Sequence, residues 1–278
     1  MVRSCCRFKL CDGTSTITDE AKNSFYCSIC LEENPSVKKN LQLSLRRIMT
    51  GNKSLCVWLF KLFKCALDNS PFSENFSPVQ EAEARKTIKA DYMTKLREEM
   101  VEVEEIELYV IGVKSLDCPW LLSTLNWIVD VESVRLEKPS YEREVKLNFP
   151  ELCSLRGVWL KLKPDVSTYF EIEKSRHSSF LALHGSPIWN WHNIIKTGLK
   201  NMSGTKFQAH GAVHGNGIYS TLDYAIAVSH CDIVPEGELK GKRGIAIVEV
   251  VDSCLLRLGK VFLSQDERLV SLRYVFVF

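Results

Sequence analysis

The spacing of apolar positions predicts helices early in the chain. Apolar residues recur on one helical face within residues 54–67 and again within 118–130, so each stretch is expected to form a helix that packs into a core. A membrane-surface helix is the alternative for residues 54–67. Residues 80–105 are rich in Glu, Lys, Arg and Ala, which indicates an exposed helix. Residues 106–113 alternate like a strand.

The last part of the chain contains more predicted strands than helices. Runs of apolar, β-branched and aromatic residues predict strands within 158–163, 244–252, 261–265 and 268–278. Residues 222–228 predict one short helix between them. This mixture indicates a compact α+β unit.

A strand followed by a sharp turn gives the clearest functional signal. The apolar run 180–183 predicts a short buried strand that ends in His184 and Gly185. Pro187 then stops the strand, and residues 188–198 have apolar positions at helical spacing and a final glycine. A strand, a turn rich in hydrogen-bond donors and a short helix together favour a ligand-binding corner. A histidine at such a place is also common as a purely structural, hydrogen-bonded residue.

A pair of glycines about thirty residues after His184 precedes a second candidate site residue, Tyr219. Gly215 and Gly217 allow the backbone to bend sharply just before Tyr219. No phosphate-binding glycine motif of either common type follows. The pair therefore predicts a bent segment that presents an aromatic hydroxyl.

Composition narrows the class of protein. The 278 residues are 45% apolar and 25% charged, and the formal net charge is +2. A nearly balanced charge gives no electrostatic signature of nucleic-acid binding. The apolar runs are shorter than the ~20 residues of a bilayer span, and the start lacks the apolar core of a signal peptide. We expect an intracellular, cytoplasmic protein without a transmembrane segment.

Cysteines are concentrated at the start of the chain. The chain has 11 cysteines, an odd number that argues against full pairing in disulfides. Cys27 and Cys30 have the spacing that presents two thiolates to one zinc ion. Two earlier cysteines can complete a four-sulfur structural zinc site: Cys6 and Cys11. Free cysteines, or acylation of the adjacent Cys5 and Cys6, are the alternatives.

These separated segments resemble one known family. The segments that begin at His184, at Gly215 and at Tyr274 are similar, in this order, to the diphtheria-toxin-like ADP-ribosyltransferases, the poly(ADP-ribose) polymerase (PARP) family. The resemblance is closest to the mono-ADP-ribosylating members and covers residues 115–278. It implies a PARP-like catalytic domain with an antiparallel split β-sheet core, which follows a helical, cysteine-rich region over residues 1–114.

The resemblance also implies roles for individual residues toward NAD, the substrate of the family. His184 would bind the ribose of the adenosine half, Gly185 the nicotinamide carboxamide, and Tyr219 the face of the nicotinamide ring. Ala227 stands where many members have a serine, and His230 stands where a second aromatic residue usually lies. The expected catalytic set is His184, Tyr219 and Tyr274, and the expected NAD-binding set is His184, Gly185, Ser186, Tyr219, Ala227 and His230.

The third catalytic position bears on the reaction. Members that elongate polymers have a glutamate there, whereas Tyr274 is a phenol that stays neutral near pH 7 and is a poor general base. The resemblance therefore implies transfer of single ADP-ribose units to protein side chains, including those of the chain itself. Two alternatives stand beside this enzyme: a degenerate transferase domain that only binds a nucleotide or a partner, and a cysteine-rich interaction protein.

Overall fold

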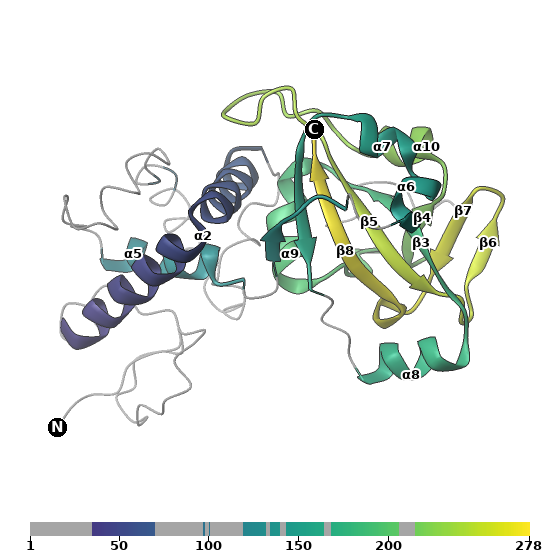
Figure 1. Ribbon diagram of the computed structural model, residues 1–278, viewed down its shortest axis with the longest axis horizontal. Helices are drawn as coiled ribbons and strands as arrows, with labels where there is room; N and C mark the ends of the chain where they lie inside the picture. The colour runs from purple at the N-terminus through teal and green to yellow at the C-terminus, as the bar shows by residue number, and fades with distance from the viewer. Residues whose placement is uncertain are drawn as a thin grey trace. The chain divides into compact units, whose positions relative to one another are not determined.

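The computed structural model describes residues 35–69, 97, 100, 119–131, 134–139, 143–163, 168–205 and 215–278. The chain divides into two compact units, Met1–Asp130 and Val131–Phe278 (Figure 1). This division falls later than the boundary expected between residues 114 and 115. The domain limits given above remain a prediction, because the residues just before 119 lie outside the described ranges.

Two helices form the described part of the first unit. Helix α2 (Pro35–Asn69) has a kink at Asn52, where φ is −148° and ψ is 49°, and it packs against α5 (Pro119–Val129). The ring of Phe63 meets that of Trp127 edge to face at 5.8 Å. The apolar face predicted within residues 54–67 is buried, which confirms a core helix there. The helix predicted over 80–105 and the strand over 106–113 lie almost wholly outside the described residues.

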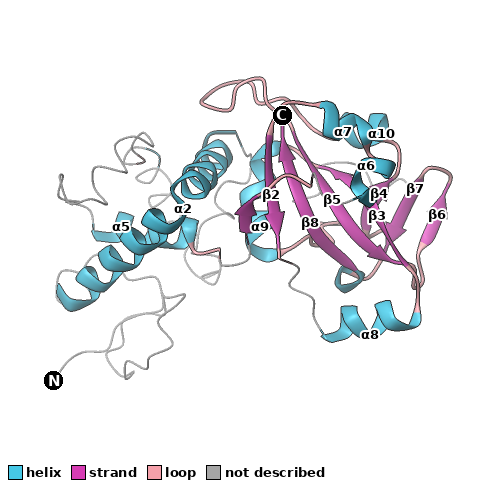
Figure 2. Cartoon of the chain, viewed as in Figure 1, coloured by secondary structure: helices cyan, strands magenta, loops and turns pink. Residues whose placement is uncertain are grey.

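The second unit is built on one antiparallel sheet with the strand order β1-β2-β8-β5-β3-β4-β7-β6 (Figure 2). Its central strands are long and apolar, and every residue of β5 is buried. The strands are β1 (Val134–Leu136), β2 (Val158–Leu162), β3 (Ser179–Gly185), β4 (Ile218–Thr221), β5 (Gly244–Val251), β6 (Leu256–Leu258), β7 (Val261–Ser264) and β8 (Val270–Val277).

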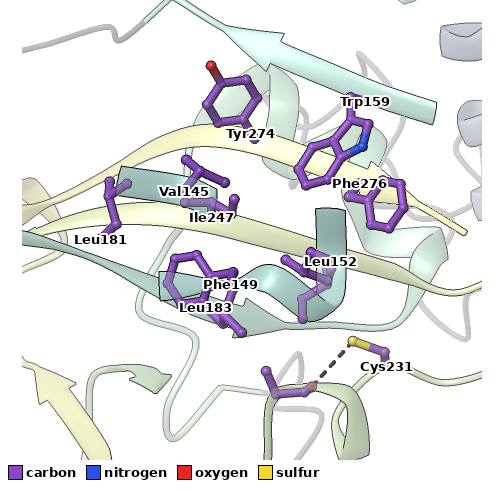
Figure 3. Close-up of a cluster of buried hydrophobic side chains, with 12 residues drawn as sticks. Val145, Phe149, Leu152, Trp159, Leu181, Leu183, Cys231, Ile247, Tyr274 and Phe276 are labelled. Atoms are coloured by element: carbon purple, nitrogen blue, oxygen red, sulfur yellow. Dashed lines mark hydrogen bonds between the residues drawn. The ribbon is translucent and has the colours of Figure 1, made fainter. Parts of the chain in front are cut away.

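Short helices lie on the two faces of this sheet. They are α6 (Arg143–Asn148), α7 (Pro150–Ser154), α8 (Thr168–Arg176), α9 (Trp191–Thr197) and α10 (Tyr224–Ser229), with the 3-10 turns η3 (Ile188–Asn190) and η4 (Glu267–Leu269). Side chains from α6, α7 and α10 pack on one face against Leu183, Ile247, Tyr274 and other apolar residues of the sheet (Figure 3). This cluster is the main core of the unit.

The α+β fold and the strands predicted over 158–163, 244–252, 261–265 and 268–278 are confirmed. The sheet also has the split expected of the family, because β3 and β4 share one register pair, Leu183 and Thr221. Helices α6, α7 and α8 were not predicted. Their apolar positions are too few for a clear helical period, and they are fixed by packing on the sheet.

Among the described residues, no helix is both long and apolar enough to cross a membrane.

Candidate functional site

The predicted corner at residues 180–198 forms as expected. Strand β3 pairs with β5 along its whole length, from Ser179 opposite Val251 to Gly185 opposite Ile245. The chain then turns through η3 into α9, which ends at Gly198 with a φ of +78°. A positive φ is inexpensive for glycine, which explains the helix stop. The corner therefore emerges from the middle of the sheet, beside the split between β3 and β4.

His184 occupies the split itself. Its Nδ1 atom lies 2.7 Å from the backbone oxygen of Tyr219 in β4, just beyond the single register pair that joins the two strands. A carbonyl oxygen only accepts hydrogen bonds, so Nδ1 carries the proton in the neutral ring. Nε2 is then the unprotonated nitrogen and can accept a hydrogen bond from a ligand hydroxyl.

The charge state of His184 follows from its surroundings. Burial lowers the pKa of this imidazole below 6.5; the hydrogen bond with the Tyr219 carbonyl acts in the opposite direction, and the charge of His230 lowers the pKa further. The ring is consequently neutral at pH 7. A neutral ring suits an acceptor of ligand hydroxyl groups better than a general acid.

Gly185 is required by close packing with α10. A Cβ atom at this position would lie 1.9 Å from the backbone oxygen of Ala227 and 3.0 Å from the Cβ of His230. The resemblance implied that Gly185 binds the nicotinamide carboxamide, and the structure shows that the end of α10 packs closely against this glycine. Gly185, Ala227 and His230 are thus brought together.

Ser186 follows Gly185 and makes hydrogen bonds within the turn and to Cys231. Its side chain is buried, and its Oγ accepts a hydrogen bond from Asn190 at 3.0 Å. Its backbone also hydrogen-bonds to the thiol of Cys231, whose pKa burial raises to about 12. Ser186 therefore stabilises the turn and the neighbouring thiol.

Tyr219 is held from both ends. Its backbone oxygen meets His184, and its hydroxyl donates to the backbone oxygen of Gly215 at 2.6 Å. Gly217 has a φ of +155°, and a Cβ there would lie 2.5 Å from the oxygen of Ser264. The glycine pair predicted to bend before Tyr219 does so, and it fixes the half-buried phenol ring at the edge of the split.

Ala227 and His230 lie at the end of helix α10. The carboxylate of Asp223 caps this helix by accepting from the amides of Ala225 and Ile226. Ala227 is 1% exposed, whereas His230 is the exposed C-cap residue. The imidazole of His230 therefore faces solvent beside Gly185, and the ring of a ligand can stack on this imidazole.

Tyr274 is the fully buried member of the predicted catalytic set. It is 1% exposed and lies in the core cluster, with its ring edge to face with Trp159 at 6.0 Å (Figure 3). It pairs with Ile247 in β5, which in turn pairs with Leu183. Because side chains alternate between the faces of a sheet, Tyr274 and His184 point to opposite faces. The structure does not bring these two side chains together, and a catalytic role for Tyr274 stays a prediction.

Sequence reasoning missed one neighbour of His184. The indole of Trp191 in α9 lies edge to face with the imidazole, with 6.2 Å between ring centroids. In the sequence, Trp191 is only one apolar position of the predicted helix. No local pattern distinguishes a core tryptophan from one that contacts a site.

The predicted zinc site cannot be placed. Cys6, Cys11, Cys27 and Cys30 all lie outside the described residues. Within the described ranges, no group of three or more metal-ligating side chains comes together, so zinc has no support from the structure.

Comparison with known proteins finds matches to one family over part of the chain. Residues 155–266 match the family model of the poly(ADP-ribose) polymerase catalytic domain. Two relatives are both named protein mono-ADP-ribosyltransferase PARP8. The human protein is 26% identical over 257 residues, which cover 80% of this chain and 29% of the relative. The mouse protein is 30% identical over 167 residues, which cover 59% of this chain and 18% of the relative.

These matches cover only part of each relative, and the family match includes only some of the predicted site residues. The aligned parts amount to less than a third of the length of either relative. The family match contains His184, Gly185 and Tyr219, and it ends before β8 and Tyr274.

Proposed function

Because the chain belongs to the poly(ADP-ribose) polymerase catalytic-domain family, we propose that it is an NAD-dependent mono-ADP-ribosyltransferase that modifies protein side chains, its own included. One observation carries most of this proposal: the His184 imidazole is bonded through Nδ1 to Tyr219 at the split in the sheet. This bond leaves Nε2 as an acceptor beside Gly185. A ribose hydroxyl is the group such an acceptor would fix.

The remaining residues fit the other end of the dinucleotide. The nicotinamide ring of NAD is flat and cationic. The half-buried ring of Tyr219 offers one flat surface, and the exposed imidazole of His230, whose Cβ lies close to Gly185, offers another. A cation on an aromatic face gains ~0.5–2 kcal/mol, depending on how dry the site is. The backbone of Gly185 is proposed to bind the carboxamide, with Ala227 and Ser186 shaping the floor.

In the proposed reaction, the bond between nicotinamide and the ribose C1′ breaks and nicotinamide leaves with the bonding electrons. A nucleophilic side chain of the acceptor protein forms the new bond to C1′ and releases its proton to solvent. Holding NAD rigidly in a bent form favours the oxocarbenium-like transition state. Tyr274 holds the third catalytic position only in the family's sequence pattern, and we propose that its buried phenol takes no part in proton transfer, which does not support chain elongation.

The proposal is tested by incubating the full chain with NAD and measuring released nicotinamide together with protein-bound ADP-ribose by mass spectrometry. The expected result is one ADP-ribose unit at each modified side chain and loss of both products in Tyr219→Ala. Nicotinamide release without any protein-bound ADP-ribose contradicts the transferase.

The second candidate is a degenerate module that binds NAD without turnover. The replacement of a second aromatic residue by His230 and of a serine by Ala227 favours it. This module predicts thermal stabilisation by NAD with no nicotinamide release under any tested acceptor.

A further inference from the structure

The side chain of Trp191 makes two contacts that its role in a core does not require. It is fully buried, and its ring lies at 86° to the imidazole of His184. Within the described part of the chain, its Nε1–H has no hydrogen-bond partner. Buried donors without partners are uncommon because they lose their bond to water. A phenylalanine would fill much of the same space without this cost.

The second contact is with Gly244 at the start of β5. A Cβ there would lie 2.4 Å from Nε1 and 2.5 Å from Cδ1 of Trp191. The backbone of Gly244 does not adopt a positive φ, so its conformation suits any residue. Gly244 pairs with Val277 in β8, and the sheet therefore fixes its position. Glycine is required here for the space that the indole ring occupies.

Through these two contacts, Trp191 joins the start of β5 to the imidazole of His184. Gly244 faces away from Ile245, which belongs to the core cluster, and His184 pairs with Ala246 on that same opposite face. The indole is thus set between a rigid strand and the imidazole. The indole packs edge to face against the imidazole, so displacement of the imidazole toward α9 would meet the indole.

We propose that Trp191, seated against Gly244, is a positioning residue that holds the His184 imidazole on the Tyr219 carbonyl and directs Nε2 toward the bound ribose. This deepens the proposed function, and its consequence for NAD rests on that function. Its consequence for the imidazole does not, because the ring geometry exists without ligand.

The test is an NMR titration of the His184 ring nitrogens in the full chain without NAD, in wild type, Trp191→Phe and Gly244→Ala. Trp189→Phe is the matched control, because this half-buried tryptophan lies just before α9, in η3. In wild type, the ring is expected to be neutral with the proton on Nδ1 and to titrate below 6.5. Both test variants should raise the midpoint toward the ordinary value of about 6.5 and mix the two tautomers, whereas the control should match wild type.

Combining the two substitutions tests whether both act through the indole. Gly244→Ala acts by displacing the indole, so it should have less effect in the Trp191→Phe background than in wild type. Far-UV circular dichroism identifies any variant that fails to fold, and either variant alone is sufficient for the test. An unchanged midpoint and tautomer in a folded Trp191→Phe or Gly244→Ala protein overturns the proposal.

Binding of NAD gives the functional arm. Weakening of the His184 hydrogen bond should raise the Kd for NAD about three- to tenfold in both test variants. If wild type does not bind NAD, the proposed function fails while the titration still decides the role of Trp191. If wild type binds and the variants bind equally well, Trp191 does not position the imidazole for the ligand.

Discussion

The imidazole of His184 and the backbone oxygen of Tyr219 meet at 2.7 Å across two strands that share one register pair. A side chain therefore bonds to a backbone group where the two strands part. The arrangement determines which ring nitrogen carries the proton, and it leaves Nε2 unprotonated as a hydrogen-bond acceptor. The proposed binding of NAD depends most on this one hydrogen bond.

Acid should weaken NAD binding through His184. Its pKa is lowered from 6.5, mainly by burial, so the neutral ring persists below pH 6.5 and is lost only on further acidification. Protonation then converts Nε2 from an acceptor to a donor and places a cation near the cationic nicotinamide ring. Calorimetric Kd values should be flat above about pH 6.5 and rise at lower pH.

His230 is a second imidazole near the same site and needs its own control. The acid dependence should survive in His230→Ala and disappear in His184→Gln. Affinity that is strongest in acid contradicts a neutral acceptor at position 184. The same sign applies to folding, since a lowered pKa means that the unfolded chain binds the proton first and stability falls as the pH drops below 6.5.

Gly185→Ala should destabilise the second unit. The added methyl group would overlap the backbone oxygen of Ala227 at 1.9 Å, and backbone atoms of a packed helix cannot move aside easily. We expect a loss of ~1–3 kcal/mol in the free energy of unfolding, the usual cost of overpacking. Denaturant titration measures it.

Gly51→Ala is the matched control, because this glycine lies in α2 and a methyl group added there would meet none of the described atoms within 4 Å. Alanine is favoured over glycine in a helix by ~0.5–1 kcal/mol, so this variant should be neutral or more stable. Equal stability of Gly185→Ala and wild type would show that α10 does not press on the corner.

Glu249→Gln should destabilise the sheet and remove part of its acid sensitivity. The buried carboxylate of Glu249 contacts Lys174 at 2.7 Å and Arg273 at 3.2 Å, and it accepts from Ser179 at 2.7 Å. Burial raises its pKa, but these hydrogen bonds and charges outweigh burial, and the net pKa is lowered. Its stabilising effect is therefore full above the unfolded pKa of about 4.3 and is lost as the pH falls through the lower folded value.

We expect Glu249→Gln to cost ~1–3 kcal/mol at pH 7, as for other charged hydrogen bonds that lose one partner. Unfolding should be compared with Glu171→Gln, which changes an exposed carboxylate on α8. The difference between wild type and Glu249→Gln should shrink toward pH 3. A difference that is independent of pH would contradict an ionised Glu249.

Tyr274→Phe should keep both the fold and the transfer of single units. The ring contacts with Trp159 and the rest of the cluster remain. The proposed reaction also requires no proton transfer to or from the phenol. Tyr274→Ala should instead cost ~3–5 kcal/mol by leaving a cavity. Mass spectrometry of modified protein measures the number of units at each site. Loss of transfer in a folded Tyr274→Phe protein would assign the hydroxyl a chemical role.

The corner of the site was predictable because its signals are local. An apolar run before His184, the break at Pro187 and the glycines before Tyr219 each restrict the backbone near their own position. The strands 244–252 and 268–278 were likewise evident from dense apolar runs. These features need no knowledge of distant residues.

Long-range features were not predictable in this way. The contact of Trp191 with Gly244 joins residues about fifty positions apart, and nothing in either segment signals it. Tyr274 and His184 point to opposite faces of the sheet because of the register between β3, β5 and β8. Helix α8 has almost no amphipathic pattern and is stabilised by packing of Phe170 on Val251 and Leu269.

The most direct test of the central claim is incubation with NAD labelled in its adenylate half, comparing wild type, His184→Ala and the exposed-histidine control His177→Ala. Label should appear on protein for wild type and His177→Ala, and His184→Ala should lose at least about tenfold, the effect of removing one ligand hydrogen bond of ~1.4 kcal/mol. Equal labelling of the folded His184→Ala protein and wild type would contradict the claim.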